Sequence, residues 1–214
     1  ATGKRFILRT AASFVKIIGG IQDRGLLIKE ELLGNETGKG GLIIIGSHVQ
    51  KTTEQLEAIK QIEELEFIEF NQHLVLIPGA LENEVRRVVS LCNKHISNGK
   101  TVVVFTRRER LDLDQGDPEL ELKVAVEISA AVTDIVVKLE VQPRFLIAKG
   151  GITSSDIGCK GLGVKKALVA GQIKPGIPVW KLGPESKYPG MPYIVFPGNV
   201  GKRETLLEII RFLN

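Results

Sequence analysis

The sequence has few of the residues that mark several common classes of protein. Its 214 residues include only two cysteines, Cys92 and Cys159, which lie far apart and form no CxxC motif. This excludes a disulfide framework and fits a reducing compartment. Three isolated histidines, His48, His73 and His95, show no spacing typical of metal ligands. We therefore expect no metal site built from side chains.

Long apolar runs are also lacking. No stretch approaches the roughly 20 apolar residues of a membrane-spanning helix, and no signal peptide opens the chain. We expect a cytoplasmic protein without a membrane partner. The chain starts abruptly at ATGKRF, without an initiating Met, and RFILRTAASFV looks like a strand that runs into a helix. This beginning suggests a fragment of a longer protein.

Charge of one sign is not concentrated anywhere along the chain. The 29 lysines and arginines are scattered among 25 acids, which gives a net charge of +4. The one dense cluster, RRER at residues 107–110, is typical of a solvated loop. A mild positive charge favours solubility and weak attraction for anions over nucleic-acid binding. We therefore expect no nucleic-acid partner.

Apolar runs and helical periods alternate along the chain. The runs are rich in β-branched residues and predict strands of a buried sheet, at residues 42–45, 67–70, 74–76, 102–105, 145–148, 178–182 and 193–196. Helical periods lie at residues 52–65, 79–98, 118–141 and 203–213. The first of them opens with TTEQ, an N-cap signature at Thr52. This alternation predicts a layered α/β fold with a largely parallel sheet and flanking helices.

Three of the predicted strands lead into loops that combine glycine with hydroxyl or amide groups. These loops read GSHVQKTTEQ from residue 46, KGGITSSDIG from residue 149 and PGNVGKRE from residue 197. Glycine lets the backbone approach a phosphate, hydroxyls add donors, and a helix start adds free N–H groups. One such loop is more often ordinary turn and cap chemistry. Three at one edge of a parallel sheet favour a phosphate site.

Familiar phosphate and nucleophile motifs do not match the sequence. It contains no GxxxxGK[ST] string, and GCKGLG at residues 158–163 has the wrong spacing and follows no predicted strand. Ser47 and His48 are adjacent, but neighbouring strand residues point to opposite faces and no partner acid is evident. Nucleophilic catalysis by this pair is therefore not expected.

Four motifs in order resemble one known family over nearly the whole chain. They are RTAASFV (9–15), GGLIIIGSHVQKTTEQL (40–56), KGGITSSDIG (149–158) and PGNVG (197–201). Together they resemble the C-terminal nucleotide-binding half of the four-carbon acid sugar kinases. LGPESKYPGMPYIVFPGNVG looks most like the branch found in multidomain proteins with aldolase or dehydrogenase segments. The resemblance implies that residues 1–214 form the nucleotide-binding domain of a larger kinase whose N-terminal substrate domain is absent.

The resemblance also implies a set of ATP-binding residues. Ser47 would lie in the nucleotide cleft, the loop after residue 149 would line the phosphates, and the loop after residue 197 would approach from the other side. The implied set is Ser47, Gly150, Gly151, Ile152, Thr153, Ser154, Gly198 and Asn199. Many family members have an acid where this chain has Ile152. Asp156 is near enough in sequence to substitute for that acid, although it is more often a helix cap.

The implied activity is in-line phosphoryl transfer from ATP, with Mg²⁺, to a sugar acid of the threonate, erythronate or oxo-tetronate type. Such a reaction asks the protein mainly for positioning and charge neutralisation. The absent N-terminal domain would hold the sugar acid and the catalytic base, so this chain alone would bind ATP or ADP without phosphorylating. Because Ile152 departs from the family pattern, a non-catalytic nucleotide- or anion-binding regulatory module stays the alternative.

Overall fold

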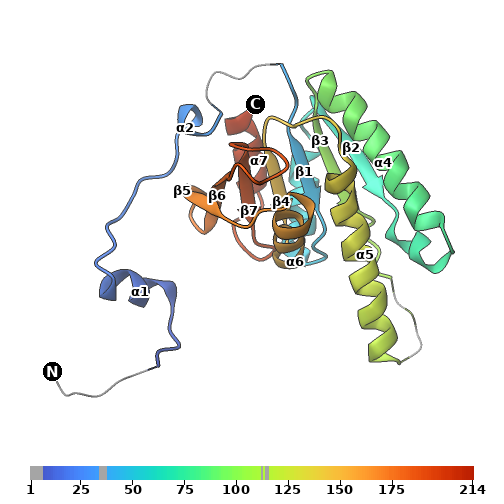
Figure 1. Cartoon of the computed structure of the whole chain (residues 1–214), viewed down its shortest axis with the longest axis horizontal. Coiled ribbons are helices and arrows are strands. Elements are labelled where there is room, and N and C mark those ends of the chain that lie inside the picture. Colours follow the sequence, from blue (N-terminus) through green and yellow to red (C-terminus); the bar gives the residue numbers. More distant parts are fainter. Residues whose placement is uncertain (1–6, 34–37, 112, 114–115) are drawn as a thin grey trace.

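A twisted sheet of mostly parallel strands forms the centre of the protein. In the computed structural model, which describes residues 7–33, 38–111, 113 and 116–214, seven strands form one sheet in the order β2-β3-β1-β4-β7-β6-β5 (Figure 1). Their bounds are β1 Leu42–Ile45, β2 Leu65–Phe70, β3 Thr101–Thr106, β4 Leu146–Lys149, β5 Ala167–Lys174, β6 Ile177–Leu182 and β7 Pro192–Phe196. The pairs from β2 to β7 are parallel, whereas β6 pairs antiparallel with both β7 and β5. The α/β fold expected from the sequence is confirmed.

Helices cover both faces of this sheet. The main ones are α3 Gln50–Ile59, α4 Ala80–Ser97, α5 Pro118–Lys138, α6 Gly151–Asp156 and α7 Thr205–Leu213. Two short turns, η1 Gln72–Leu76 and η2 Ile157–Gly161, follow β2 and α6. Helices α4 and α5 pack on one face together with η2, and α6 contacts α5 on the same side. Helices α3 and α7 pack on the other face.

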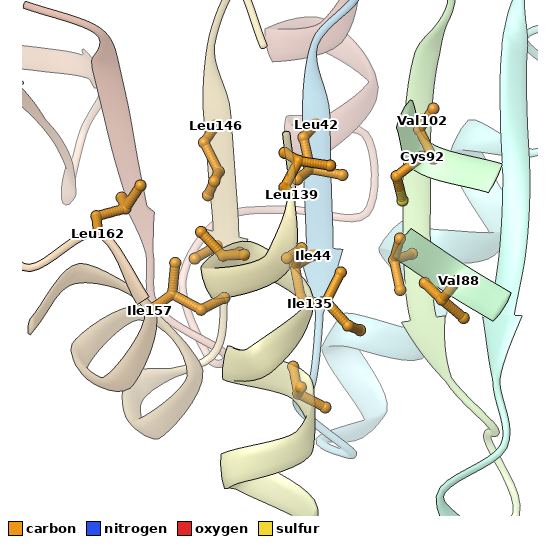
Figure 2. Packing of buried hydrophobic residues seen from close by; sticks show 14 of the residues in the cluster. Leu42, Ile44, Val88, Cys92, Val102, Ile135, Leu139, Leu146, Ile157 and Leu162 are labelled. Atoms are coloured by element: carbon orange, nitrogen blue, oxygen red, sulfur yellow. The ribbon is translucent and has the colours of Figure 1, made fainter. Parts of the chain in front are cut away.

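The two faces have separate apolar cores, because side chains alternate along each strand. In β1, Leu42 and Ile44 face α4 and α5, whereas Ile43 and Ile45 face α3 and α7. Figure 2 shows the first core, where Ile135 of α5 lies over the central strands. Every residue of β1 and β4 is buried, which explains why these strands read as continuous apolar runs.

Connections from neighbouring strands leave in opposite directions at the carboxyl ends of the strands. Strands β1, β4 and β7 are neighbours in the sheet. The chain leaves β1 for α3 on one face, leaves β4 for α6 on the other, and leaves β7 for α7 on the first face again. Such reversals open a crevice at the sheet edge, where parallel α/β proteins bind their ligands.

Some expected elements differ from those in the structure. Residues 74–76, predicted as a strand, lie in the 3-10 turn η1, where the Asn71 side chain accepts from the backbone N–H of His73. Helix α3 begins at Gln50, so Thr52 lies inside the helix rather than at its N-cap, and the helix ends at Ile59, before the predicted residue 65. Strand β5 was not expected from the sequence.

An extended N-terminal arm precedes the sheet. It carries the short helices α1 Ala12–Ile18 and α2 Lys29–Leu33, and Figure 1 shows α1 lying away from the sheet. Residues 7–11 form no strand, unlike the expectation for RFILRTAASFV, of which residues 5–6 lie outside the described residues. The arm meets the body at Leu27, which is buried and whose N–H donates to Gln172 O on β5. None of the described helices is both long and apolar enough to cross a membrane.

Candidate functional site

Three glycine-containing loops meet at the carboxyl ends of β1, β4 and β7. Backbone hydrogen bonds continue the sheet into these loops, since Gly46 N–H donates to Lys149 O and Gly150 N–H donates to Phe196 O. The loops therefore start from a fixed register. The structure brings together the predicted residues Ser47, Gly150 and Gly198, which belong to three separate loops.

Glycine is required here because the loops approach one another closely. A Cβ on Gly198 would lie 2.7 Å from Ser47 Oγ, and a Cβ on Gly150 would lie 3.1 Å from Ser47 Cβ. A Cβ on Gly46 would collide with the Thr153 hydroxyl. Real Cβ atoms rarely pack at such distances, so the junction requires glycine, which has no side chain, at these positions. It is a packed arrangement of backbone rather than three independent turns.

Gly150 and Gly151 serve this junction in different ways. Gly150 has φ +131°, a conformation that residues with a side chain rarely adopt. Gly151 begins α6 with an ordinary φ, and a Cβ placed on it would meet no protein atom within 4 Å. Thus Gly150 shapes the turn, whereas Gly151 leaves open space in front of the first turn of a helix, whose N–H groups have no acceptor within the helix.

Buried polar side chains fasten the loop after β7. Thr52 Oγ1 donates to Gly198 O at 3.0 Å, and Gln55 Nε2 donates to Val200 O at 3.1 Å and Lys202 O at 2.8 Å. Both side chains come from α3 and are fully buried. Lys149 Nζ of β4 also donates to this loop, to Pro197 O at 2.8 Å. The loop is therefore held in place before any ligand arrives.

A cavity of about 800 Å³ lies beside the junction. Ile152 and Thr153 line it together with Gly46, and residues of the first half of α5 form its apolar wall. Ile152 is 73% exposed, so this apolar side chain stands open at the mouth. A second hollow of similar volume lies at the amino ends of the strands, with acidic and basic residues both lining it. Parallel α/β sheets bind ligands at the carboxyl ends, which favours the first.

Three other residues considered from the sequence occupy different environments. Ser154 is buried, and its hydroxyl donates to Gly151 O at 3.1 Å within the first turn of α6. Asn199 is exposed on the loop after β7. Asp156 lies at the end of α6, where it accepts from Ser129 Oγ and pairs with Lys160 at 2.8 Å. These contacts hold the pKa of Asp156 below its usual value, and its carboxylate is already engaged away from the N-cap of α6.

The family of the chain follows from a comparison with known families. The family model described as the nucleotide-binding C-terminal domain matches residues 42–206, which include all three loops of the junction. The chain belongs to this nucleotide-binding domain family. The sequence resembled the C-terminal nucleotide-binding domain of the four-carbon acid sugar kinase family. This family assignment is confirmed.

Solved structures share the fold of this nucleotide-binding domain. A DUF1537 protein from Bordetella bronchiseptica, a domain-swapped dimer with bound citrate, is 14% identical with a TM-score of 0.65, over 85% of this chain and 42% of that one. A DUF1537-family protein from Haemophilus influenzae is 18% identical with a TM-score of 0.61, over 93% and 45%. The chain thus spans less than half the length of these proteins. No curated protein matches the sequence.

Sequence reasoning missed several contributors to the nucleotide-binding domain's cleft. Arg108, expected in a solvated loop, is half-buried, and its Nη2 donates at 2.8 Å to both Ser47 O and Thr53 Oγ1. His48 Nε2 lies 3.1 Å from Arg107 O, and burial lowers the pKa of His48. The only sequence signal for Arg108 was its position directly after a strand, the same signal that singled out the glycine loops.

Proposed function

We propose that this chain is the ATP-binding half of a kinase that phosphorylates a four-carbon sugar acid. The observation that carries the proposal is the junction of three loops on neighbouring parallel strands, where Gly150 and Gly198 pack against Ser47 and Gly151 faces open space. A triphosphate needs several donors converging at short range, and a glycine-lined helix start supplies them. The family is a nucleotide-binding domain, which supports the same ligand.

In this proposal the chain binds and orients the nucleotide, and a second domain supplies the sugar acid and the base. The solved relatives are more than twice as long as the part that this chain matches, which leaves room for such a domain. The donors on the three loops would hold the phosphates in line with the acceptor hydroxyl. Fixed N–H dipoles stabilise negative charge without having to reorganise during the reaction. Closure by the second domain would exclude water.

Mg²⁺ belongs to the proposal only as an ion held by the phosphates themselves. Mg²⁺ in phosphoryl transfer neutralises charge on the phosphate oxygens, and it needs few protein ligands. Within the described residues, no three His, Cys, Asp or Glu side chains gather as a metal site. The phosphate loop itself carries Ile152 where many family members have an acid. We therefore assign Mg²⁺ no ligand among these residues.

Ile152 favours a second candidate function, a regulatory module that binds a nucleotide or another anion without transferring a phosphoryl group. An exposed isoleucine at the mouth of the cleft adds apolar surface where an acid would add charge. A site altered in this way can retain the N–H donors of the loop while losing a group used in transfer. The two candidates agree on binding and differ on turnover.

Calorimetry and a coupled kinase assay test the proposal together. We expect residues 1–214 to bind ATP and ADP and to leave tetronic acids unphosphorylated. The longer protein that contains this chain should convert at least one of a panel of threonate, erythronate and oxo-tetronate isomers. Nucleotide binding without turnover on any of them by the longer protein would favour the regulatory module. Robust phosphorylation by residues 1–214 alone would contradict the proposed division between two domains.

A further inference from the structure

Lys149 is a fully buried lysine. It ends β4, directly before Gly150, and its side chain is 0% exposed. Glu84, the other buried acidic or basic residue among those that the structure describes, forms an ion pair with Arg87 at 2.7 Å. Among the residues that the structure describes, no carboxylate lies within ion-pair distance of Lys149. An unpaired buried charge is costly, so its presence calls for a physical reason.

The contacts of Lys149 point to the phosphate site. Its Nζ donates to Pro197 O at 2.8 Å and lies 3.4 Å from Gly198 O. The ammonium group also stands over the Phe196 ring, 3.7 Å from the centroid. Thus a single side chain links the strand that leads into Gly150 with the loop after β7. Gly198 O also accepts from the hydroxyl of Thr52, which anchors the same loop from α3.

We propose that Lys149 is the buried cation of the phosphate site, which fixes the Pro197–Gly198 peptide beneath the cleft and takes up a proton when the phosphates of a nucleotide bind. This inference rests on the proposed nucleotide site. Lys149 is a positioning residue in this scheme, because it contacts the loop carbonyls rather than the ligand.

The electrostatic surroundings explain why the proton would be taken up on binding. Burial, and secondarily the charge of Lys51 on α3, lower the pKa of Lys149 to about 7. The groups that contact it from β7 and the following loop are carbonyls and an aromatic ring, which carry no charge. At pH 8 the amine is therefore mostly neutral in the free protein. Several negative charges brought into the adjacent loop favour the ammonium form and raise this pKa.

Proton uptake can be measured by calorimetry in buffers that differ in ionisation enthalpy. At pH 8 the phosphates of ADP have already lost their titratable protons, so a proton taken up on binding goes to the protein. We expect uptake of roughly 0.5–0.9 proton per ADP, and an ADP affinity that falls by up to about tenfold per pH unit above pH 7. Adenosine, which lacks phosphates, should bind without uptake.

Lys149→Met retains the length of the side chain and removes the amine. We expect this variant to lose the proton uptake and the pH dependence of ADP binding, and to bind ADP about tenfold more weakly at pH 7. Lys187→Met is the matched control, since Lys187 also donates to backbone carbonyls, those of Val136 and Val137, and burial also lowers its pKa. Lys187 lies outside the junction, so its variant should behave like the wild type. His48 lines the cavity beside the junction, and uptake that persists in Lys149→Met would contradict the role of Lys149 and move the assignment to His48.

The outcomes separate this inference from the proposed function. No ADP binding by the wild type would overturn both. ADP binding without proton uptake, or equal uptake in the wild type and Lys149→Met, would overturn the role of Lys149 alone. If Lys149→Met does not fold, NMR of wild-type protein labelled at lysine Cε decides. A lysine signal that titrates near pH 7, and at higher pH with ADP, supports the proposal. A lysine titration that ADP leaves unchanged refutes it.

Discussion

Replacement of Gly151 by valine separates a phosphate-binding loop from an ordinary turn. The backbone at Gly151 has an ordinary φ, and an added Cβ would meet no protein atom within 4 Å. The substitution therefore introduces neither strain nor a clash. Valine also has a slightly better helix propensity than glycine, so the stability of α6 should change by a few tenths of a kcal/mol at most. We expect thermal melts and circular dichroism of Gly151→Val to match the wild type.

The effect on ligand binding should be large for the same geometric reason. The valine side chain would fill the open space at Gly151, the first residue of α6, where we propose that the phosphates bind. A hydrogen bond to a charged group is worth about 1.5–3 kcal/mol. The loss of one such bond to a phosphate raises the Kd by roughly 10- to 150-fold. ATP titrations by calorimetry at fixed Mg²⁺ measure this directly.

Gly25 provides the matched control. It too has an ordinary φ and open space around its would-be Cβ, but it lies on the N-terminal arm. Gly25→Val should leave both the melting temperature and the ATP affinity unchanged. Normal affinity in a folded Gly151→Val protein would refute the phosphate-binding loop. A lowered melting temperature with intact affinity would show that Gly151 acts only as a turn residue.

Three further measurements test the junction. Ser47→Ala should weaken ATP binding by roughly 1 kcal/mol, the usual worth of one hydrogen bond, and unchanged affinity by calorimetry would leave Ser47 a structural turn residue. Thr153→Val keeps the shape of the side chain and removes one donor, so it should cost less affinity than Gly151→Val in the same titration. Because the pKa of Lys149 is about 7 in the folded protein, against an ordinary lysine value of 10.5, the unfolded chain binds more protons above pH 7. The free energy of unfolding by urea should therefore rise from pH 7 to 8.5. Above about pH 9 the raised pKa of Cys92 has the opposite effect on stability and offsets this rise. A flat profile from pH 7 to 8.5 would contradict the buried amine.

The sequence predicts the central part of the fold well, because burial on both faces leaves a plain signal. Residues 42–45 are apolar at every position, and the structure has β1 at those positions. The strand prediction fails where apolar residues have another use, as in residues 74–76 of η1. Strand β5 escapes prediction because Gly171 interrupts it with φ +149° and the register shifts between Val169 and Gly171. Its side chains are partly exposed and show no regular alternation.

The loops of the candidate site can be predicted from the sequence, but the buried side chains that hold the loop after β7 in place cannot. Glycine after a buried strand can be read directly, and this signal located the loops that contain Gly150 and Gly198. The positions of Thr52 and Lys149 depend on the strand order β1-β4-β7, which brings together residues about 50–150 positions apart. Thr52 looked like a helix cap because Ser and Thr at a helix start usually are caps. Lys149 carried no local signal, since a lysine at a strand end is ordinarily solvated.

The pairing of the N-terminal arm with β5 bears on how this domain can be expressed and purified. Strand β5 lies at the edge of the sheet, and it exposes Leu168 and Val169. An open edge with apolar side chains is a template for strand-to-strand aggregation. The arm occupies part of this edge, through Leu27 N–H on Gln172 O and Arg24 on Ala170 O. We therefore expect a chain that begins after Leu33 to expose more of this edge and to self-associate more readily than residues 1–214.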